Sequence, residues 1–121
     1  MKLVSYRKQG ALQVGVVDGK NVVDLPGIAD LGAALMQGVD VIASAKAALS
    51  GSGARTPLEG IAYAAPVTRP NKIVCLGLNY YDHAKEGGRE KPDYPWFFFR
   101  GATSLIAHGE AGLRPRVSDR Q

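Results

Sequence analysis

The sequence of 121 residues contains a single cysteine, Cys75, and no apolar run near the length of a membrane span. One thiol cannot form an internal disulfide, so a reducing compartment fits the chain and we expect a cytoplasmic protein. Crossing a bilayer takes roughly 20 consecutive apolar residues, so we expect no membrane partner. The N-terminus also lacks the apolar core and the small-residue cleavage site of a signal peptide.

The chain has a basic balance, with a formal net charge of +4, but it lacks a basic run interleaved with aromatic residues. Its basic residues are scattered, except for Arg114, Arg116 and Arg120 near the end. We therefore expect no nucleic-acid partner, although a basic nucleic-acid-binding protein remains an alternative that predicts salt-sensitive binding. A mild positive field suits an enzyme for anionic substrates. The 45% hydrophobic and 21% charged residues indicate a folded globular chain.

The first half of the chain predicts a small α+β domain over residues 1–65. Residues 2–6, 12–17 and 21–25 are mostly apolar or β-branched, and Asp18-Gly19 is typical of a tight hairpin turn. These residues predict a three-stranded antiparallel meander, which we interpret as scaffold because it carries no group of titratable side chains.

Two amphipathic helices are predicted after the meander, over residues 28–37 and 39–49, where apolar residues recur at helical spacing. We expect both to cover the meander. Residues 56–59 read as a turn, and residues 61–64 read as a short extended strand. Prolines then mark a boundary near residues 65–71, and residues 66–121 form a second predicted domain.

The most informative stretch is residues 72–86. Its apolar start, residues 73–76, predicts a buried strand that ends at Gly77, and Asn79 stands where a helix N-cap would stand. A helix over residues 80–86 would place His83 and Glu86 on one face, since they are three residues apart. Such a pair can move a proton near neutral pH. A surface helix with a routine His–Glu contact is the alternative.

The segment after this helix contains a polar loop and an aromatic strand. Gly87-Gly88 would act either as hinges for a lid or as part of an ordinary exposed loop. Residues 96–99 predict a strand whose side chains are mostly core, and Arg100 follows it with a guanidinium that can bind a carboxylate in two places. His108 has no partner nearby in the sequence, and we interpret it as structural.

Several motifs in this order resemble the fumarylacetoacetate hydrolase family, in particular bacterial members with a small N-terminal domain. The resemblance is strongest from residue 72 to residue 104 and covers nearly the whole chain. It rests on residues 77–86 (GLNYYDHAKE), 95–100 (PWFFFR), 103–105 (TSL), 108–109 (HG) and 114–115 (RP), with 1–6 (MKLVSY) and 14–19 (VGVVDG) for the N-terminal domain.

The resemblance implies a catalytic role for His83 and Glu86 and substrate contacts for Arg100 and Tyr80. It also implies Mg²⁺ or Mn²⁺, held in the family by a Glu-x-Glu pair and a later Asp. No Glu-x-Glu occurs in this sequence, and Glu110-Ala111-Gly112 departs from the family's usual loop. We therefore expect no metal ligand and no bound metal in this chain, which reads as the front third of an enzyme with an incomplete β-roll.

The resemblance further implies an enzyme that acts on a small anionic keto or dicarbonyl acid and forms a homo-oligomer such as a homodimer. Carbon–carbon bond cleavage through a metal-held enolate, with water activated by the His–Glu pair, is the leading prediction. Isomerases, decarboxylases and hydratases of similar acids belong to the same family. The alternative is a non-catalytic module that associates with itself.

Overall fold

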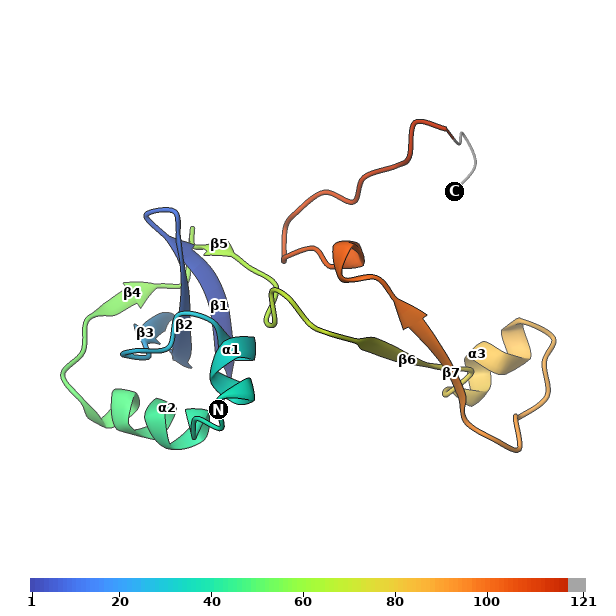
Figure 1. The fold of residues 1–121 in the computed structure, drawn as a ribbon, viewed down its shortest axis with the longest axis horizontal. Helices are drawn as coiled ribbons and strands as arrows, with labels where there is room; N and C mark the ends of the chain where they lie inside the picture. Colours follow the sequence, from blue (N-terminus) through green and yellow to red (C-terminus); the bar gives the residue numbers. More distant parts are fainter. Residues whose placement is uncertain (118–121) are drawn as a thin grey trace. The chain divides into compact units, whose positions relative to one another are not determined.

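The computed structural model describes residues 1–117, which form a mixed α/β structure (Figure 1). Contacts divide the chain into two compact units, Met1–Arg69 together with the segment that begins at Leu105, and Pro70–Ser104. The elements in chain order are β1 (Leu3–Lys8), β2 (Ala11–Asp18), β3 (Asn21–Asp24), α1 (Leu31–Met36), α2 (Val41–Ser50), β4 (Arg55–Pro57), β5 (Ala62–Tyr63), β6 (Ile73–Gly77), α3 (Tyr81–Glu86), β7 (Trp96–Arg100) and the 3₁₀ turn η1 (Ala102–Ser104).

The first unit is built on an antiparallel sheet with the strand order β4-β3-β2-β1-β5. Its centre is the predicted meander, so that expectation is confirmed. The β2–β3 turn places Gly19 at a φ of 61°, a conformation that glycine adopts without steric cost. Asp18 pairs with Asn21 across that turn, which closes a two-residue hairpin loop.

The sheet is wider than the three strands that we predicted. Residues 56–59 do not simply form a turn, because β4 pairs with the free edge of β3 and Thr56 lies opposite Val22. At the other edge β5 pairs with β1, with Tyr63 opposite Tyr6, which confirms the short strand predicted over residues 61–64 and adds it to the sheet. Both added strands have only two or three residues, and their pairing satisfies backbone groups that the meander leaves open.

Each helix of the first unit begins at an aspartate cap. The Asp30 carboxylate accepts a hydrogen bond from the Ala33 N–H at 2.9 Å, and the Asp40 carboxylate accepts one from the Ala43 N–H at 2.9 Å. The helices therefore start later than the apolar pattern alone suggested, because the cap residue itself has a non-helical backbone. None of the helices within residues 1–117 is long and apolar enough to cross a membrane.

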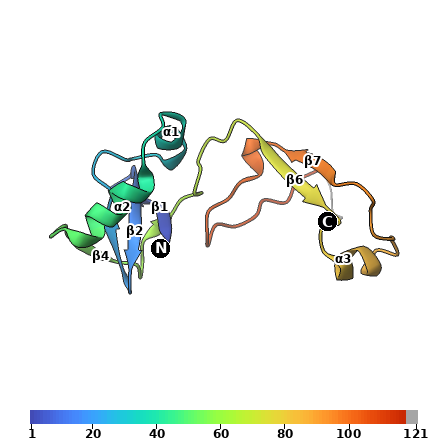
Figure 2. The same ribbon diagram turned by 90° about the horizontal axis from the view of Figure 1, so that it is seen from below.

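Both helices cover the sheet and bury the core of the unit, as expected (Figures 1 and 2). The core combines apolar side chains of β2 and β3 with those of the helices and of the segment before them: Val14, Val16, Val23, Leu25, Ile28, Ala34, Val41 and Ala45.

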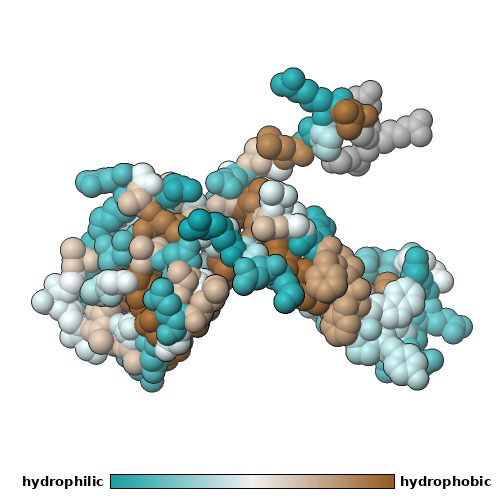
Figure 3. Space-filling view, viewed as in Figure 1, coloured by the Kyte–Doolittle hydropathy of each residue, from teal (hydrophilic) through white to brown (hydrophobic). Residues whose placement is uncertain are grey.

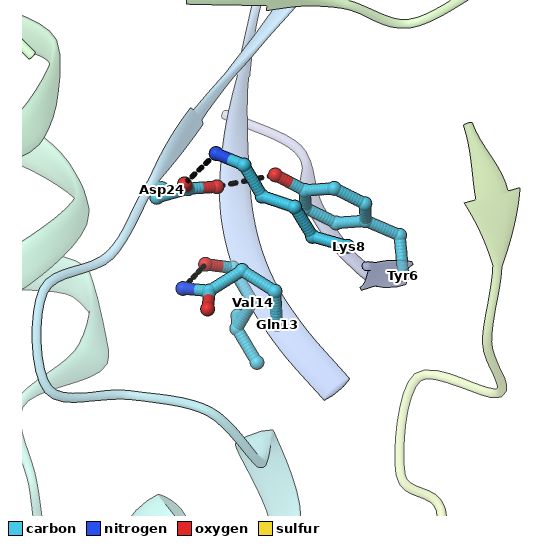
Figure 4. A network of polar contacts seen from close by, with 5 residues as sticks. All are labelled: Tyr6, Lys8, Gln13, Val14 and Asp24. Atoms are coloured by element: carbon cyan, nitrogen blue, oxygen red, sulfur yellow. Dashed lines mark hydrogen bonds and ion pairs between the residues drawn. The ribbon is translucent and has the colours of Figure 1, made fainter. Parts of the chain in front are cut away.

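A polar network joins β1 to β3 within this sheet (Figure 4). The Tyr6 hydroxyl donates a hydrogen bond to the Asp24 carboxylate, and the Lys8 ammonium forms an ion pair with the same carboxylate at 2.7 Å. Tyr6 is 2% exposed. Burial and the neighbouring carboxylate both raise the pKa of the Tyr6 hydroxyl well above its usual value.

Hydrogen bonds fasten residues 66–68 to the first unit. The Ser5 hydroxyl donates to the Pro66 carbonyl oxygen at 3.0 Å, and the Thr68 hydroxyl donates to the Asp30 carboxylate at 2.6 Å. The Thr68 bond, helped by the backbone N–H of Ala33, lowers the pKa of Asp30. The segment after β5 is thus tied to both the sheet and the cap of α1.

The second unit contains a two-stranded antiparallel sheet of β6 and β7, with Gly77 opposite Trp96 and Ile73 opposite Arg100. Our expectation of a buried strand and an aromatic core is wrong for the described chain. Val74 is 52% exposed, and every residue of β7 is exposed. A two-stranded sheet has no second layer to bury its side chains against, and apolar side chains lie at the surface around β6 and β7 (Figure 3).

Candidate active site

A tight turn connects β6 to α3 and decides how the short helix is presented. Leu78 has a φ of 51°, in the left-handed region that a branched side chain seldom adopts. The N-cap of α3 is Tyr80, without a side-chain capping bond, and not Asn79 as we predicted. The left-handed residue turns the chain sharply, so the helix begins one residue later than the sequence pattern suggested.

The helix α3 exposes both members of the predicted catalytic pair. His83 and Glu86 lie three residues apart, and both side chains are exposed, whereas Ala84 between them is buried. No hydrogen bond or ion pair joins the two side chains in the part of the chain that the structure describes. Both side chains are free to approach a third group, such as a substrate.

A cleft of about 440 Å³ lies in the second unit beside this helix. Its lining includes the end of β6 and its turn, residues 76–79, and the loop of residues 91–95, which forms one wall. Tyr81 and Ala84 of α3 complete the lining, while His83 does not contribute to it. Asp82, Lys85 and Glu86 border a second, more open hollow. The helix therefore separates the cleft from a charged outer face.

The two predicted substrate contacts occupy different parts of the second unit. Tyr80 directly precedes α3 and is 75% exposed. Arg100 ends β7 opposite Ile73, four pairs along the sheet from the Gly77–Trp96 pair where the turn to α3 starts. Four residues of an antiparallel strand span about 14 Å, so the structure does not bring Arg100 next to the turn.

The described residues do not fit a divalent metal site. Within residues 1–117, no three His, Cys, Asp or Glu side chains lie close enough together to hold an ion. Carboxylate-rich clusters are what Mg²⁺ and Mn²⁺ require. Arg120, named above among the basic residues near the end, lies outside the described residues.

Sequence reasoning did not identify the loop of residues 91–95 as the lining of a cleft. Lys91, Asp93 and Tyr94 line the cleft, and Pro92 and Pro95 alternate with them. The sequence leaves two alternatives open for this segment, a lid with hinges at Gly87-Gly88 or an ordinary exposed loop. The two prolines were the available signal, because each restricts φ and so stiffens a loop that can then form a wall.

His108, interpreted as structural, lies far along the chain from this site. Its ring packs edge-to-face against the Tyr63 ring of β5, with the ring centres 5.1 Å apart and the planes at 85°. That contact is a packing interaction within the first unit.

Comparison with known proteins finds one family along the second half of the chain. Residues 72–121 match the family described as fumarylacetoacetate (FAA) hydrolase, C-terminal. Human mitochondrial oxaloacetate tautomerase FAHD2A is 37% identical to the chain over 86 residues, which are 70% of this chain and 27% of the human protein.

Two further relatives show how much of each protein is matched. Mitochondrial oxaloacetate tautomerase fahd2 of Xenopus laevis is 30% identical over 127 aligned residues, covering 98% of this chain and 40% of the frog protein. An uncharacterized protein of Methanocaldococcus jannaschii is 46% identical over 52 residues, covering 43% of this chain and 22% of that protein. The chain thus spans between 22% and 40% of the length of these relatives.

Proposed function

The chain belongs to the fumarylacetoacetate hydrolase family, and from this premise we propose that it supplies the N-terminal domain and the opening of the catalytic domain of an enzyme for small keto acids. The proposed domains are residues 1–65 and residues 66–121, the latter being the first strands of an incomplete β-roll. The relatives named as oxaloacetate tautomerases favour keto–enol conversion of a small dicarboxylic keto acid as the reaction.

The observation that carries this proposal is the exposed His83 on a short helix directly after a strand end. Keto–enol conversion removes a proton from the carbon beside a carbonyl and delivers one to the carbonyl oxygen. An imidazole can do both near neutral pH, because its ordinary pKa lies close to 6.5. Glu86, one helical turn away, would orient the ring and stabilise its charged form. Tyr80 and Arg100 are proposed substrate contacts, Arg100 through its fork to a carboxylate.

Hydrolysis of a carbon–carbon bond in a dicarbonyl acid remains the related proposal, with the same pair activating a water molecule. The family's Mg²⁺ or Mn²⁺ is proposed for the complete enzyme, although the described residues do not fit its site. A homo-oligomer and a cytoplasmic setting also remain proposals. The printed names of the human and frog relatives describe those two proteins as mitochondrial.

Substitution of His83 in the complete enzyme tests the proposal, with oxaloacetate as substrate and enol absorbance as the readout. General acid–base catalysis contributes about 10² to 10⁴ in rate, so His83→Ala should lower kcat by that factor without weakening Mg²⁺ affinity. Glu86→Gln should cause part of the loss. His108→Ala is the matched control, since the chain has two histidines and His108 packs in the first unit. Near-parental kcat for His83→Ala would refute the role.

The exposed β6–β7 sheet favours a second candidate, a non-catalytic module that associates with copies of itself. Its open edges and exposed aromatic side chains resemble the surfaces through which sheets pair. Titration of the 121-residue chain with Mn²⁺, together with its mass in solution, separates the two. Tight stoichiometric Mn²⁺ binding or turnover by this chain would contradict an inert module. A concentration-dependent dimer with neither property would support it.

A further inference from the structure

The segment after the C-terminal end of α3 brings Arg89 into contact with Trp96. The Arg89 N–H donates a hydrogen bond to the Ala84 carbonyl oxygen at 2.8 Å, and Gly88 has a φ of 65°. This left-handed residue reverses the chain at the end of the helix, as helix C-termini commonly require. After this reversal, the guanidinium carbon of Arg89 lies 5.8 Å from the centre of the Trp96 ring.

That contact joins the two ends of a loop. Arg89 follows α3, which ends at Glu86, and Trp96 is the first residue of β7, where it pairs with Gly77 of β6. The residues between them, 90–95, include the stretch 91–95 that forms one wall of the 440 Å³ cleft. A contact between the ends of this loop therefore holds a wall of the cleft in place.

Among residues 1–117 the ion pairs join other residues, so the Arg89 guanidinium contacts the Trp96 ring without also forming a salt bridge. Glu90 and Asp93 lie in the same loop, yet neither forms an ion pair with Arg89. A flat guanidinium over an indole face is a favourable arrangement, since the ring face carries negative charge density. Trp96 is 51% exposed, so the pair forms at the surface.

We propose that Arg89 and Trp96 are positioning residues that fasten the C-terminal end of α3 to the start of β7. The contact closes residues 90–95 over the cleft and holds the helix that carries His83 and Glu86. At an exposed site a cation–π contact favours the closed loop over the open one by about 2- to 5-fold. Such a bias is small enough for a ligand to strengthen or release. The consequence for catalysis rests on the proposed function, whereas the contact itself does not.

Nuclear magnetic resonance on the 121-residue chain tests the contact without turnover. Trp96 is the one tryptophan of the sequence, so its ring is the only indole that can shift the Arg89 side-chain protons upfield. We expect that upfield shift in the parent chain and its loss in Trp96→Leu. The protection of the Arg89, Gly87 and Gly88 amides from hydrogen exchange should fall by about 2- to 5-fold.

Arg89→Gln tests the same contact without touching the β6–β7 pairing, in case Trp96→Leu disrupts the sheet. It should lower the protection of the Gly87 and Gly88 amides by a similar factor. Lys91→Ala is the matched control, because it removes one positive charge from the same loop and should leave that protection unchanged. Absence of the upfield shift, or unchanged protection in Arg89→Gln, would overturn the proposal.

The same variants separate this proposal from the proposed function. In the complete enzyme, Arg89→Gln should change KM or kcat by about the same 2- to 5-fold, far less than His83→Ala. If the Arg89–Trp96 contact is detected but His83→Ala leaves kcat unchanged, the catalytic role of His83 is refuted and the positioning role stands. If His83→Ala lowers kcat strongly but no Arg89–Trp96 contact is detected, the positioning role is refuted and the catalytic role stands.

Discussion

The buried Tyr6 side chain makes the stability of the first unit depend on pH. The Tyr6 side chain is buried, and its hydroxyl donates a hydrogen bond to the Asp24 carboxylate (Figure 4). The same carboxylate forms an ion pair with Lys8. The pKa of this hydroxyl is raised, chiefly by burial and then by Asp24. The folded state therefore keeps the Tyr6 proton at pH values where the unfolded chain releases it.

We predict that Tyr6→Phe changes the alkaline stability of the chain. With a raised folded-state pKa, the contribution of Tyr6 is fully present below the ordinary tyrosine pKa of about 10 and declines as pH rises above it. The phenylalanine variant should lose about 1.5 kcal/mol at pH 7, because a hydrogen bond to a charged acceptor is removed. Its deficit should then shrink above pH 10.

Urea unfolding of both proteins between pH 7 and pH 11 checks this prediction. Tyr81→Phe is the control, since Tyr81 is 69% exposed and should tolerate the loss of its hydroxyl. If the difference in unfolding free energy between the parent and Tyr6→Phe stays constant across that pH range, the Tyr6–Asp24 bond does not control the loss of stability at alkaline pH.

At the scale of elements, β2 and β3 approach so closely that only glycine fits at position 15. A Cβ built on Gly15 would lie 2.9 Å from the Val23 carbonyl oxygen and would collide with the Val22 side chain. Val22 and Val23 are both buried, and Val23 belongs to the core cluster. The collision would therefore fall on backbone and on packed side chains, which cannot move aside freely.

We predict that Gly15→Ala destabilises the first unit by about 1–3 kcal/mol, the usual cost of overpacking. Gly112→Ala serves as the control, because a Cβ at Gly112 meets no atom within 4 Å. The urea midpoints of both variants and the parent provide the measurement. Equal midpoints for Gly15→Ala and the parent would mean that the two strands separate more easily than their packing indicates.

The β6–β7 sheet behaves differently at the same scale. Its residues have the β-branched and aromatic character of a core strand, yet every residue of β7 is exposed and no residue of β6 is fully buried, because two strands cannot enclose a layer. The strand assignments were predictable from composition alone. The burial was not, since burial depends on what packs against the sheet and not on the strand itself.

At the scale of the whole molecule, the first unit depends on a segment that lies beyond its last strand. Residues 66–68 form two hydrogen bonds with earlier parts of the unit: the Ser5 hydroxyl donates to the Pro66 carbonyl oxygen, and the Thr68 hydroxyl donates to the Asp30 carboxylate. Asp30 also caps α1, so the Thr68 bond holds a carboxylate that the helix requires. Stability of the unit should therefore change when the chain is cut on either side of this segment.

We predict that residues 1–69 fold alone and that residues 1–64 fold less stably by about 1–3 kcal/mol, the sum of two net hydrogen bonds. Circular dichroism of both pieces should show mixed helix and strand, and urea unfolding should rank them. A spectrum of disorder for residues 1–69 would contradict an independent unit. Equal unfolding midpoints for the two pieces would show that residues 66–68 add no stability.

The sequence by itself determined the local elements of this protein. Apolar and β-branched segments with the Asp18-Gly19 turn predicted the meander, and helical spacing predicted α1 and α2. The helix predicted over residues 80–86 corresponds to α3. These features depend on neighbours within a few residues, where turn geometry and periodicity act directly. The placement of His83 and Glu86 on the short helix α3 could be predicted for the same reason.

The tertiary structure decided what depends on residues far apart or on a single backbone angle. The strand β4 forms, and the predicted strand β5 finds its partner, because the meander offers free edges. The start of α3 moves because Leu78 adopts a left-handed conformation. The cleft beside α3 and the Arg89–Trp96 contact need a loop to fold back onto a strand. No local pattern encodes such closures, because their free energy comes from contacts that exist only after the chain has folded.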